Sequence, residues 1–255
     1  TRVKFVTDYM DQEEVATVVS RYDIMAVPVV DRDQRLVGII TVDDILDVIE
    51  KEATEDVLRM AGSHEDELGE DDTFYEKVVK SVKVRLPWLL VTLFGGLISG
   101  LIMNRIEADL RAVVALTYFI PLLLGLGGNA GTQSSTVTVR GISTGQIDSS
   151  KIFYNVIRDS LVGMCVGLFC GMILCGVAYV WMGDTALSIL VGLTLVCNMT
   201  IASSLGTLVP LLLKRIGIDP AASAAPFIST GSDIIGLLVY SAWASIFMPL
   251  LAGLL

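Results

Sequence analysis

The sequence near the C-terminal end contains the apolar stretch Ile234-Ile-Gly-Leu-Leu-Val-Tyr-Ser-Ala-Trp-Ala-Ser-Ile-Phe-Met248, which follows directly on Asp233. With the residues before it, this stretch is long enough to span a lipid bilayer as a helix. Asp233 carries the only charge between residues 220 and 255, and a carboxylate near mid-membrane costs roughly 2.5 to 3.5 kcal/mol on insertion scales. We therefore expect a cation, a water-filled cavity or a paired base to compensate it. A helix-capping or interhelical hydrogen-bonding acid is the alternative interpretation.

The distribution of charge separates the chain into two parts. Residues 1–85 hold 11 Lys and Arg against 21 Asp and Glu, whereas residues 86–255 hold seven of each kind. The first part is polar enough to fold in water. The second part contains five charge-free stretches near or above the roughly 20 residues that cross a bilayer, which predicts five transmembrane helices. These stretches are residues 86–104, 112–139, 160–183, 185–213 and, apart from Asp233, the residues from 220 onward.

Basic residues beside membrane spans favour the cytoplasmic side. If residues 1–85 lie in the cytosol, nine Lys and Arg residues flank the spans on that side, and only Arg105 and Arg111 flank them on the other. We therefore predict a cytosolic N-terminal part and, after five spans, a C-terminus on the outer side. Because the chain begins at Thr1 rather than at an initiator Met, we expect it to be a piece of a longer protein.

The first 52 residues predict a small α/β unit. Asp11 is followed three residues later by a Glu, which is the capping-box pattern of a helix N-terminus. Two apolar runs, residues 26–30 and 36–40, flank a polar turn and indicate a β-hairpin. A second capped helix begins at Thr41, with Asp44 in the third position. The expected order is helix, strand, strand, helix.

The helix that begins at Thr41 carries a run of acidic residues. Spacings of three and four residues place several carboxylates on one helical face, where like charges repel by a few tenths of a kcal/mol per pair. A hard divalent cation with oxygen ligands would relieve this repulsion, and a solvated helix face is the alternative. The candidate metal ligands are Asp44, Asp47, Glu52, Glu55 and Asp56. A second acidic run, residues 65–72, is expected to form a loop.

The second charge-free stretch contains Pro121 and several glycines, which predicts a broken helix with freed backbone carbonyls near residues 124–130. Irregular backbone at membrane depth is tolerated where it is buried or lines a wet cavity, and close packing through small residues is the alternative. The last span repeats the pattern, with Pro226 and small polar residues interrupting the approach to Asp233. The candidate pore-lining residues are Gly128, Asn129, Thr132, Gln133, Ser229 and Thr230.

Two segments of the N-terminal part resemble a CBS domain. They are Tyr22-Asp-Ile-Met-Ala-Val-Pro-Val-Val-Asp and Leu36-Val-Gly-Ile-Ile-Thr-Val-Asp-Asp. In that family, a Thr and an Asp placed like Thr41 and Asp44 hold a nucleotide ribose, so the resemblance implies an ATP site; a plain capped helix is the alternative. CBS motifs normally work as tandem pairs, and one is visible here. The chain is therefore expected to hold the second motif of a pair.

The membrane part resembles the MgtE family of magnesium channels and transporters. The resemblance is carried by Pro121-Leu-Leu-Leu-Gly-Leu-Gly-Gly-Asn-Ala-Gly-Thr-Gln-Ser-Ser, by Pro226-Phe-Ile-Ser-Thr-Gly-Ser-Asp-Ile-Ile-Gly, and by the junction Glu52-Ala-Thr-Glu-Asp. It covers nearly the whole chain. It implies a homodimer in the bacterial inner membrane, whose Mg²⁺ pore lies between the second and fifth spans of both copies, with Asp233 at the ion path.

The expected fold is therefore mostly α: a CBS domain fragment (1–52), an acidic junction and connecting helix (53–85), and a five-helix transmembrane pore domain (86–255). We expect cytosolic Mg²⁺ on the acidic helix to favour a closed pore, and Mn²⁺, Co²⁺ and Ni²⁺ are the other candidate ions. An ion-coupled carrier and a nucleotide sensor with a membrane anchor are the alternatives. An enzyme is not expected, because no second acid or base lies at membrane depth away from the span ends. No nucleic-acid partner is expected.

Overall fold

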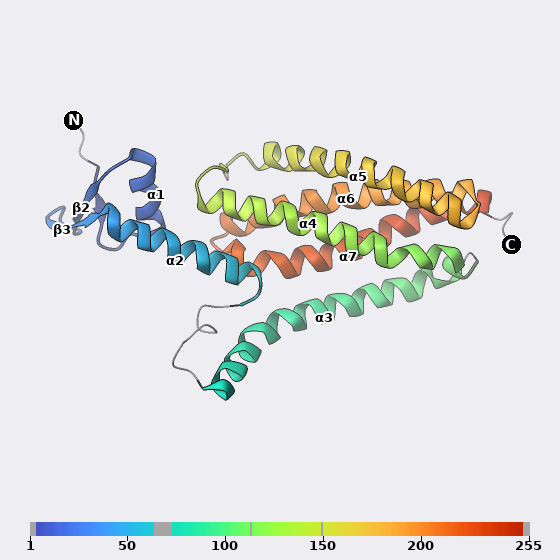
Figure 1. Ribbon diagram of the computed structural model, residues 1–255, viewed down its shortest axis with the longest axis horizontal. Coiled ribbons are helices and arrows are strands. Elements are labelled where there is room, and N and C mark those ends of the chain that lie inside the picture. Colours follow the sequence, from blue (N-terminus) through green and yellow to red (C-terminus); the bar gives the residue numbers. More distant parts are fainter. Residues whose placement is uncertain (1–3, 64–72, 113, 149, 252–255) are drawn as a thin grey trace.

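The computed structural model describes residues 4–63, 73–112, 114–148 and 150–251. A small domain with three strands and a long helical bundle lie end to end, and helix α2 (Val42–Met60) runs from one to the other (Figure 1). The fold is mostly helical, as predicted. The second acidic run, residues 65–72, lies outside the described residues.

The N-terminal domain packs helices against a three-stranded sheet. Its elements are β1 (Val6–Thr7), α1 (Gln12–Tyr22), β2 (Ala26–Val30) and β3 (Leu36–Thr41). Strands β2 and β3 pair antiparallel, with Val27 opposite Ile40, and β1 pairs parallel with β2. The hairpin and the order helix, strand, strand, helix are confirmed. Strand β1 was not predicted, because two residues are too few to show a period.

Side chains cap both of the helices predicted in this domain. Asp11 accepts a hydrogen bond from the backbone N–H of Glu13 (2.9 Å) at the start of α1. At the start of α2, the Thr41 hydroxyl donates to the Asp44 carboxylate (2.8 Å) in a capping box. From there α2 is helical for 19 residues, across the boundary predicted at residue 52. The acidic helix is therefore a continuous connection from the sheet to the bundle.

Helix α3 (Phe74–Ala112) joins the predicted connecting helix and the first span in one element of 39 residues. At 1.5 Å per residue it is about 58 Å long, almost twice the roughly 30 Å hydrocarbon thickness of a bilayer. Thr73 and Glu76 cap its start, because the Thr73 hydroxyl donates to the Glu76 carboxylate (2.6 Å). The N-terminal part of α3 turns away from the bundle (Figure 1), and Pro87 lies inside the helix, where proline favours a bend.

The predicted break in the second span is wrong. Residues 112–139 divide into a 3₁₀-helix, η2 (Val114–Phe119), and a continuous helix, α4 (Ile120–Ser143). Pro121 lies in the first turn of α4, where its missing N–H costs no helical hydrogen bond. The glycines that follow are helical and allow neighbours to approach: a Cβ at Gly131 would lie 3.2 Å from the Ala202 carbonyl oxygen. Close packing, the alternative interpretation, explains them.

The predicted interruption of the last span is also wrong, because α7 (Pro220–Leu251) is helical throughout. Pro226 lies inside this helix and the small polar residues after it keep helical geometry. The Asp219 carboxylate accepts a hydrogen bond from the Ala221 N–H (2.9 Å) just before the helix. This contact fits the predicted N-cap followed by Pro220 in the first helical position.

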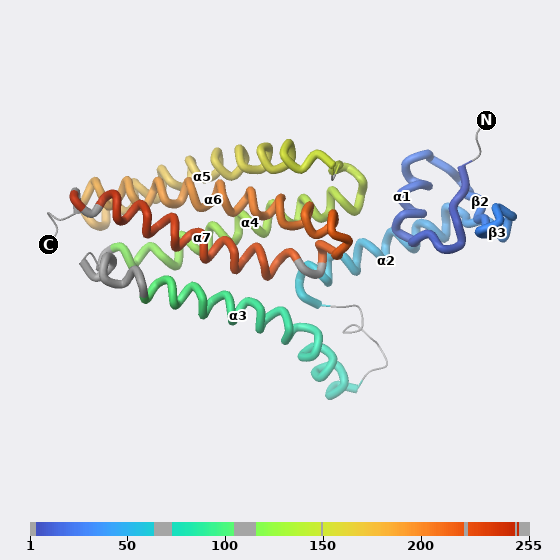
Figure 2. Tube along the Cα trace, turned by 180° about the vertical axis from the view of Figure 1, so that it is seen from behind, coloured from blue at the N-terminus to red at the C-terminus, as the bar shows by residue number. Residues whose placement is uncertain are grey.

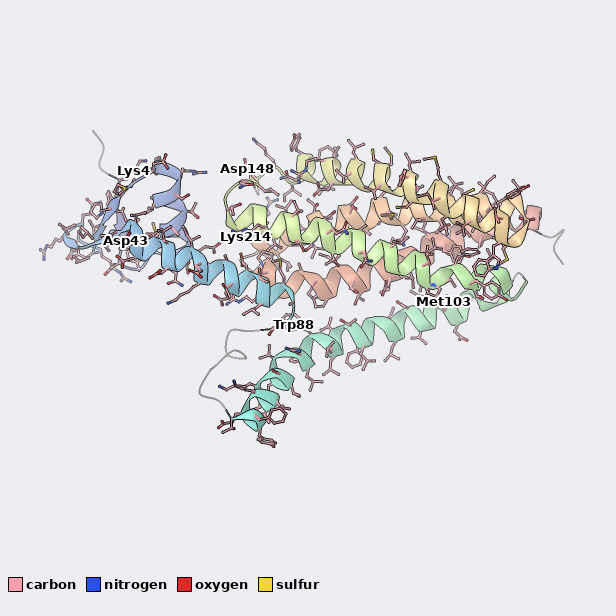
Figure 3. All side chains as sticks on the ribbon, viewed as in Figure 1. Lys4, Asp43, Trp88, Met103, Asp148 and Lys214 are labelled. Carbon is pink, nitrogen blue, oxygen red and sulfur yellow. The ribbon has the colours of Figure 1, made fainter. Side chains whose placement is uncertain are left out.

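Helix α6 (Thr185–Arg215) forms the centre of the bundle. It packs against α4, α5 (Ile152–Met182) and α7, and 56% of its most apolar segment is buried, against 6% for α3. Seen from behind, α7 lies between α6 and α3 (Figure 2). Asp148 and Lys214 lie at the bundle end that faces the N-terminal domain, whereas Met103 lies toward the other end (Figure 3).

Four helices of the described chain are long and apolar enough to cross a membrane. They are Phe74–Asn104 in α3, α5, α6 and Ala224–Phe247 in α7. Helix α4 is not among them, because glycines and amide and hydroxyl side chains follow its apolar start and lower its mean hydropathy. Four of the five predicted spans are therefore supported. The second predicted span, which corresponds to α4, stays a prediction.

The contact between α5 and α6 predicts a position that tolerates no side chain. A Cβ at Gly171 would lie 2.8 Å from the Gly192 carbonyl oxygen, whereas a Cβ at Gly176, on the same helix, would meet nothing within 4 Å. Gly171→Ala should therefore cost about 1–3 kcal/mol of stability through overpacking. Gly176→Ala is the matched control and should be nearly neutral. Thermal unfolding in nanodiscs measures both, and equal effects would contradict this packing.

Candidate functional site

Asp233 lies on the part of α7 that packs near α4. Its side chain is partly buried, and its neighbour Ser232 is 2% exposed and faces Gly128 of α4, whose Cβ would lie 3.9 Å from the Ser232 hydroxyl. Among the described residues, none donates a hydrogen bond to the Asp233 carboxylate or forms an ion pair with it. The compensation expected for this carboxylate is therefore not supplied from within the described part of the chain.

A row of polar residues on α4 is exposed beside this position. Asn129, Thr132 and Thr136 are three or four residues apart and lie on one face of the helix. The Thr132 hydroxyl donates to the Gly128 carbonyl oxygen (2.9 Å), and the Thr136 hydroxyl donates to that of Thr132 (3.0 Å). Each hydroxyl therefore donates its hydrogen bond to a backbone carbonyl of α4 itself. Neither needs a partner on a second helix. We call Asn129, Thr132 and Thr136 the α4 polar row.

The structure brings some of the candidate pore residues together and separates others. Thr132 and Ser229 line one cavity of about 240 Å³, whose lining otherwise comes from the end of α2, from α3 and from α7. Gln133 instead lines a different cavity, between α4, α5 and α6. Thr230 packs against α3, where a Cβ at Gly95 would overlap it. Successive residues of a helix point about 100° apart around its axis. Gln133 therefore points to a different side of α4 than Thr132, and Thr230 to a different side of α7 than Ser229.

The five candidate carboxylates of α2 do not converge. Within the described ranges, no group of three or more His, Cys, Asp or Glu side chains is placed to hold a metal ion. Glu52 accepts a hydrogen bond from Gln12 (2.7 Å), and Asp47 is exposed. Asp44 is bound to the Thr41 hydroxyl, and both residues are at least partly exposed at the start of α2. A cation site on α2 and a nucleotide site at Thr41 and Asp44 stay predictions.

The C-terminal end of α2 is attached to the bundle through ionic and polar contacts. Arg59 forms ion pairs with Glu55 of its own helix and with Asp219 at the start of α7. Asp56 accepts a hydrogen bond from the Ser143 hydroxyl at the end of α4 (2.8 Å). One of the candidate metal ligands, Asp56, therefore links the acidic helix directly to the bundle, and Glu55 supports Arg59, which forms the second link. Sequence patterns did not predict the pairing of Arg59 with Asp219, because 160 residues separate the two.

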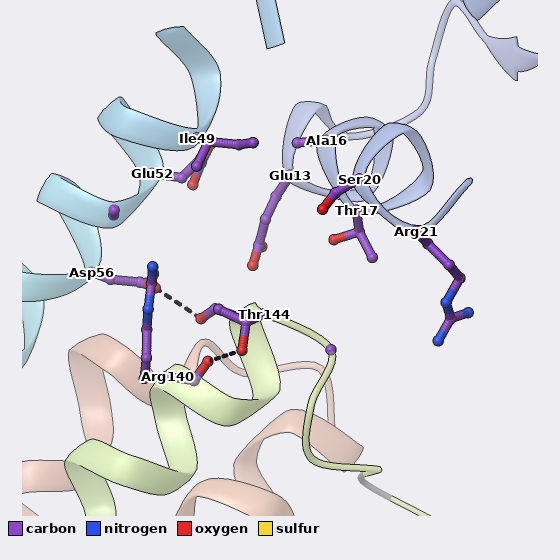
Figure 4. Close-up of a pocket in the computed structure, with 13 residues that line it drawn as sticks. Glu13, Ala16, Thr17, Ser20, Arg21, Ile49, Glu52, Asp56, Arg140 and Thr144 are labelled. Carbon is purple, nitrogen blue, oxygen red and sulfur yellow. Dashed lines mark hydrogen bonds between the residues drawn. The ribbon is translucent and has the colours of Figure 1, made fainter. Parts of the chain in front are cut away.

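A cavity of about 310 Å³ lies where α1, α2 and the end of α4 meet (Figure 4). Glu13, Glu52 and Asp56 contribute carboxylates to its lining, and Arg21 and Arg140 contribute positive charge. Burial raises the pKa of Glu13 above its ordinary value of 4.5; Lys214 opposes this shift, and the nearby carboxylates add to it. A negative charge on Glu13 is therefore unfavourable in this cavity.

A second buried carboxylate, which sequence patterns did not single out, lies in the bundle. Asp159 of α5 is 7% exposed; Arg158 Nε donates to it (2.9 Å), and the Thr207 hydroxyl of α6 also donates to it. Thr138 of α4 in turn donates to Thr207 (3.4 Å). These contacts join three helices near the end that faces the N-terminal domain. In the sequence, Arg158 and Asp159 are adjacent just before the third charge-free stretch. Charged residues commonly flank a membrane span, so this pair did not indicate a buried carboxylate.

Membrane-length helices, a partly buried carboxylate on α7 with no partner among the described residues, and an attached small α/β domain are features of a multi-pass membrane protein of the transporter class. Residues 120–243 match the family model MgtE, described as divalent cation transporter, and residues 1–51 match the CBS domain model. The chain belongs to the MgtE family, as the motifs predicted.

Relatives with known names cover almost all of this chain. It is 40% identical to the magnesium transporter MgtE of Bacillus subtilis, over 97% of the chain and 54% of that protein. It is 38% identical to the magnesium transporter MgtE of Thermus thermophilus, over 94% of the chain and 52% of that protein. For the Enterococcus faecalis protein of the same name, the identity is 37%, over 93% and 51%. The chain spans about half the length of the curated relatives it matches.

The raised pKa of Glu13 predicts that removing its charge increases the stability of the fold, and that this increase depends on pH. A group whose pKa is raised on folding stabilises the fold below its unfolded pKa and loses that contribution as pH rises through the folded value. Glu13→Gln should therefore raise the melting temperature at about pH 7, and the gain should vanish below about pH 4.5.

The matched control for this prediction is Glu14→Gln, because Glu14 lies on the same helix but is exposed. Thermal melting of both variants across the pH range provides the comparison. A gain for Glu14→Gln equal to that for Glu13→Gln would refute a burial effect at Glu13.

Proposed function

We propose that this chain forms the ion-conducting part of a magnesium transporter. Two copies pair through the faces formed by α4 and α7, and a pore runs along their common axis with one Asp233 carboxylate on each side. The observation that carries this proposal is the partly buried Asp233, which has no partner among the described residues and lies near the α4 polar row. A second copy of the same chain would supply the missing surroundings.

The α4 polar row supports a covered face rather than a lipid-facing one. Asn129 is exposed, and an exposed amide in hydrocarbon would lack hydrogen-bond partners. Two-fold pairing places identical patches against each other, so one α4 polar row would face its copy. A water-filled space between them would solvate the amides and hydroxyls. The cavity that Thr132 and Ser229 share is also lined by the end of α2 and by α3, and it forms the cytosolic approach to this path.

The chemistry of Mg²⁺ fits a site of this kind. The ion requires octahedral oxygen coordination and gives up its water reluctantly, so a pore can hold it through its hydration shell. Two facing carboxylates provide negative charge without displacing that shell. Conduction also requires weak binding, because an ion held by many direct ligands would not leave. Backbone carbonyls freed by helix breaks have no part in this pore, because α4 and α7 are continuous helices.

The relatives support magnesium as the transported ion, since all three are named magnesium transporters. The side of the membrane follows from the basic residues and the position of the N-terminal domain. Lys214 lies at the end of the bundle that faces this domain (Figure 3). We therefore infer that the N-terminal domain and this end of the bundle are cytosolic.

Regulation by cytosolic Mg²⁺ is part of the same proposal. The end of α2 is tied to α7 through Arg59 and Asp219 and to α4 through Asp56 and Ser143. A change in the position of α2 therefore acts on the two helices that we assign to the pore. Magnesium bound to the acidic face of α2 would hold α2 in place by screening its like charges, with further ligands from neighbouring domains.

Replacing Asp233 tests the pore directly. Asp233→Ala should reduce Mg²⁺ uptake into proteoliposomes to less than about a tenth of the wild-type rate, because the charge that attracts the ion is lost. Asp233→Glu, which keeps the charge, should retain measurable uptake. A magnesium-sensitive dye inside the vesicles provides the measurement. The control is Asp148→Asn, which removes an exposed carboxylate between α4 and α5 and should leave uptake unchanged. Undiminished uptake by Asp233→Ala would remove this residue from the ion path.

The regulatory proposal makes a separate prediction. Neutralising most of the candidate ligands on α2 should weaken inhibition by cytosolic Mg²⁺, because four of the five carboxylates proposed to bind the ion are lost. The combined substitutions are Asp44→Asn, Asp47→Asn, Glu52→Gln and Glu55→Gln. Patch-clamp recording with varied cytosolic Mg²⁺ should show inhibition shifted to higher concentrations by about 10-fold or more, or lost. Glu14→Gln with Asp33→Asn, both in the same domain, is the control. Unchanged inhibition in the fourfold variant would contradict this mechanism.

A further inference from the structure

The centre of the bundle holds a buried polar side chain that lies outside the candidate pore residues. Asn198 of α6 is 1% exposed. Its Nδ2 donates a hydrogen bond to the Leu123 carbonyl oxygen of α4 (2.7 Å). Its Oδ1 is buried and accepts no hydrogen bond within the described part of the chain. A buried amide that is only half satisfied costs free energy, so packing alone does not explain its presence.

Two helices present a glycine to this amide. On α4, a Cβ at Gly127 would overlap the Asn198 amide group. On α7, a Cβ at Gly236 would lie 2.9 Å from Oδ1 and 3.1 Å from Nδ2. The hydrogen that replaces this Cβ at Gly236 therefore points at Oδ1, where a weak Cα–H contact is the available interaction. The Asn198 amide thus fills the space between α4 and α7 at the level of Gly127 and Gly236.

The level of this contact matters because it coincides with the candidate ion path. Gly127 directly precedes Gly128, and the first member of the α4 polar row follows two residues after it. Gly236 follows Asp233 by three residues, which is close to one helical turn and on the same side of α7. One side chain of α6 therefore touches both helices within a turn of the residues that we assign to the pore.

We propose that Asn198 is a positioning residue, whose amide fixes the register of α4 against α7 and thereby the placement of Asp233 relative to the α4 polar row. The Leu123 carbonyl oxygen has two lone pairs, so it can accept from Asn198 in addition to its own helix. A slide or rotation of α4 would break this hydrogen bond and leave both amide atoms of Asn198 unpaired. The polar contact therefore selects one register of α4 against α7. Apolar packing between small residues alone would allow several registers. This proposal rests on the proposed function for its effect on transport.

A double-substitution cycle separates positioning from simple packing. Asn198→Ala removes the donor and leaves a space, whereas Gly127→Ala adds a methyl group that overlaps the amide. In the double variant, the new methyl group occupies part of the space, so packing recovers but the hydrogen bond does not. We expect the apparent KM for Mg²⁺ to rise about 10-fold in Asn198→Ala and to stay raised in the double variant, while the melting temperature of the double variant recovers.

A control and a volume-matched variant accompany this cycle. Asn155 of α5 is also buried, and its Nδ2 donates to the Asp148 carbonyl oxygen (3.3 Å), away from α4 and α7. Asn155→Ala should lower the melting temperature and leave KM unchanged. Asn198→Leu keeps most of the side-chain volume without the donor, so it tests the hydrogen bond even if Asn198→Ala does not fold. Its KM should rise as in Asn198→Ala.

A distance measurement tests the register without any transport. Spin labels at Thr136 of α4 and Leu238 of α7, both exposed, report the relative position of the helices when labelled protein is diluted with unlabelled protein. We expect one narrow distance distribution for wild-type protein and a shifted or broadened one for Asn198→Leu and for the double variant. An unchanged distribution, or recovery of KM in the double variant, would overturn the positioning role. If the wild-type protein transports no Mg²⁺, the proposed function fails, and the distances still decide the role of Asn198.

Discussion

The requirement that buried polar groups find partners determines how this bundle is built. Asp159 meets it within one chain, because Arg158 and Thr207 both donate to its carboxylate. Asn198 meets this requirement with one of its two amide atoms, because its Nδ2 donates to the Leu123 carbonyl oxygen. Asp233 is different, because no described residue pairs with it. A carboxylate with no internal partner is explained most simply by an ion and a second copy of the chain, and the proposed pore follows from that difference.

Patterns with a short period were readable from the sequence. The hairpin, the caps at Asp11 and Thr41, and the N-cap at Asp219 all depend on neighbours within a few residues, and the structure contains each of them. The helix breaks were misjudged because proline and glycine have two uses. Pro121 lies in a first turn, where it costs nothing, and Gly131 serves close packing. A single sequence does not distinguish these uses from a break.

Candidate site residues could be selected from the sequence, but their arrangement could not. Charge-free context singled out Asp233, and a cluster of polar residues after the glycines of the second span singled out Asn129 and Thr132; their role in a pore stays a prediction. Long-range partners were out of reach: Asn198 contacts α4 75 residues away, and Arg59 pairs across 160 residues. The same contacts connect the parts of the molecule. The acidic helix reaches α4 and α7 through its own end, and α6 holds those two helices in register through one amide.

In the proposed pore, two Asp233 carboxylates share one hydrated Mg²⁺ between two copies of this chain. A high-resolution structure of the reconstituted protein in Mg²⁺, with Mn²⁺ as a substitute whose anomalous signal identifies the ion, tests it most directly. We expect a two-fold dimer with ion density on its axis between the Asp233 side chains. The carboxylate oxygens should lie beyond the roughly 2.0–2.1 Å of direct magnesium ligation, with water between. A dimer whose axis runs elsewhere, or an axis that lacks ion density beside Asp233, would contradict it.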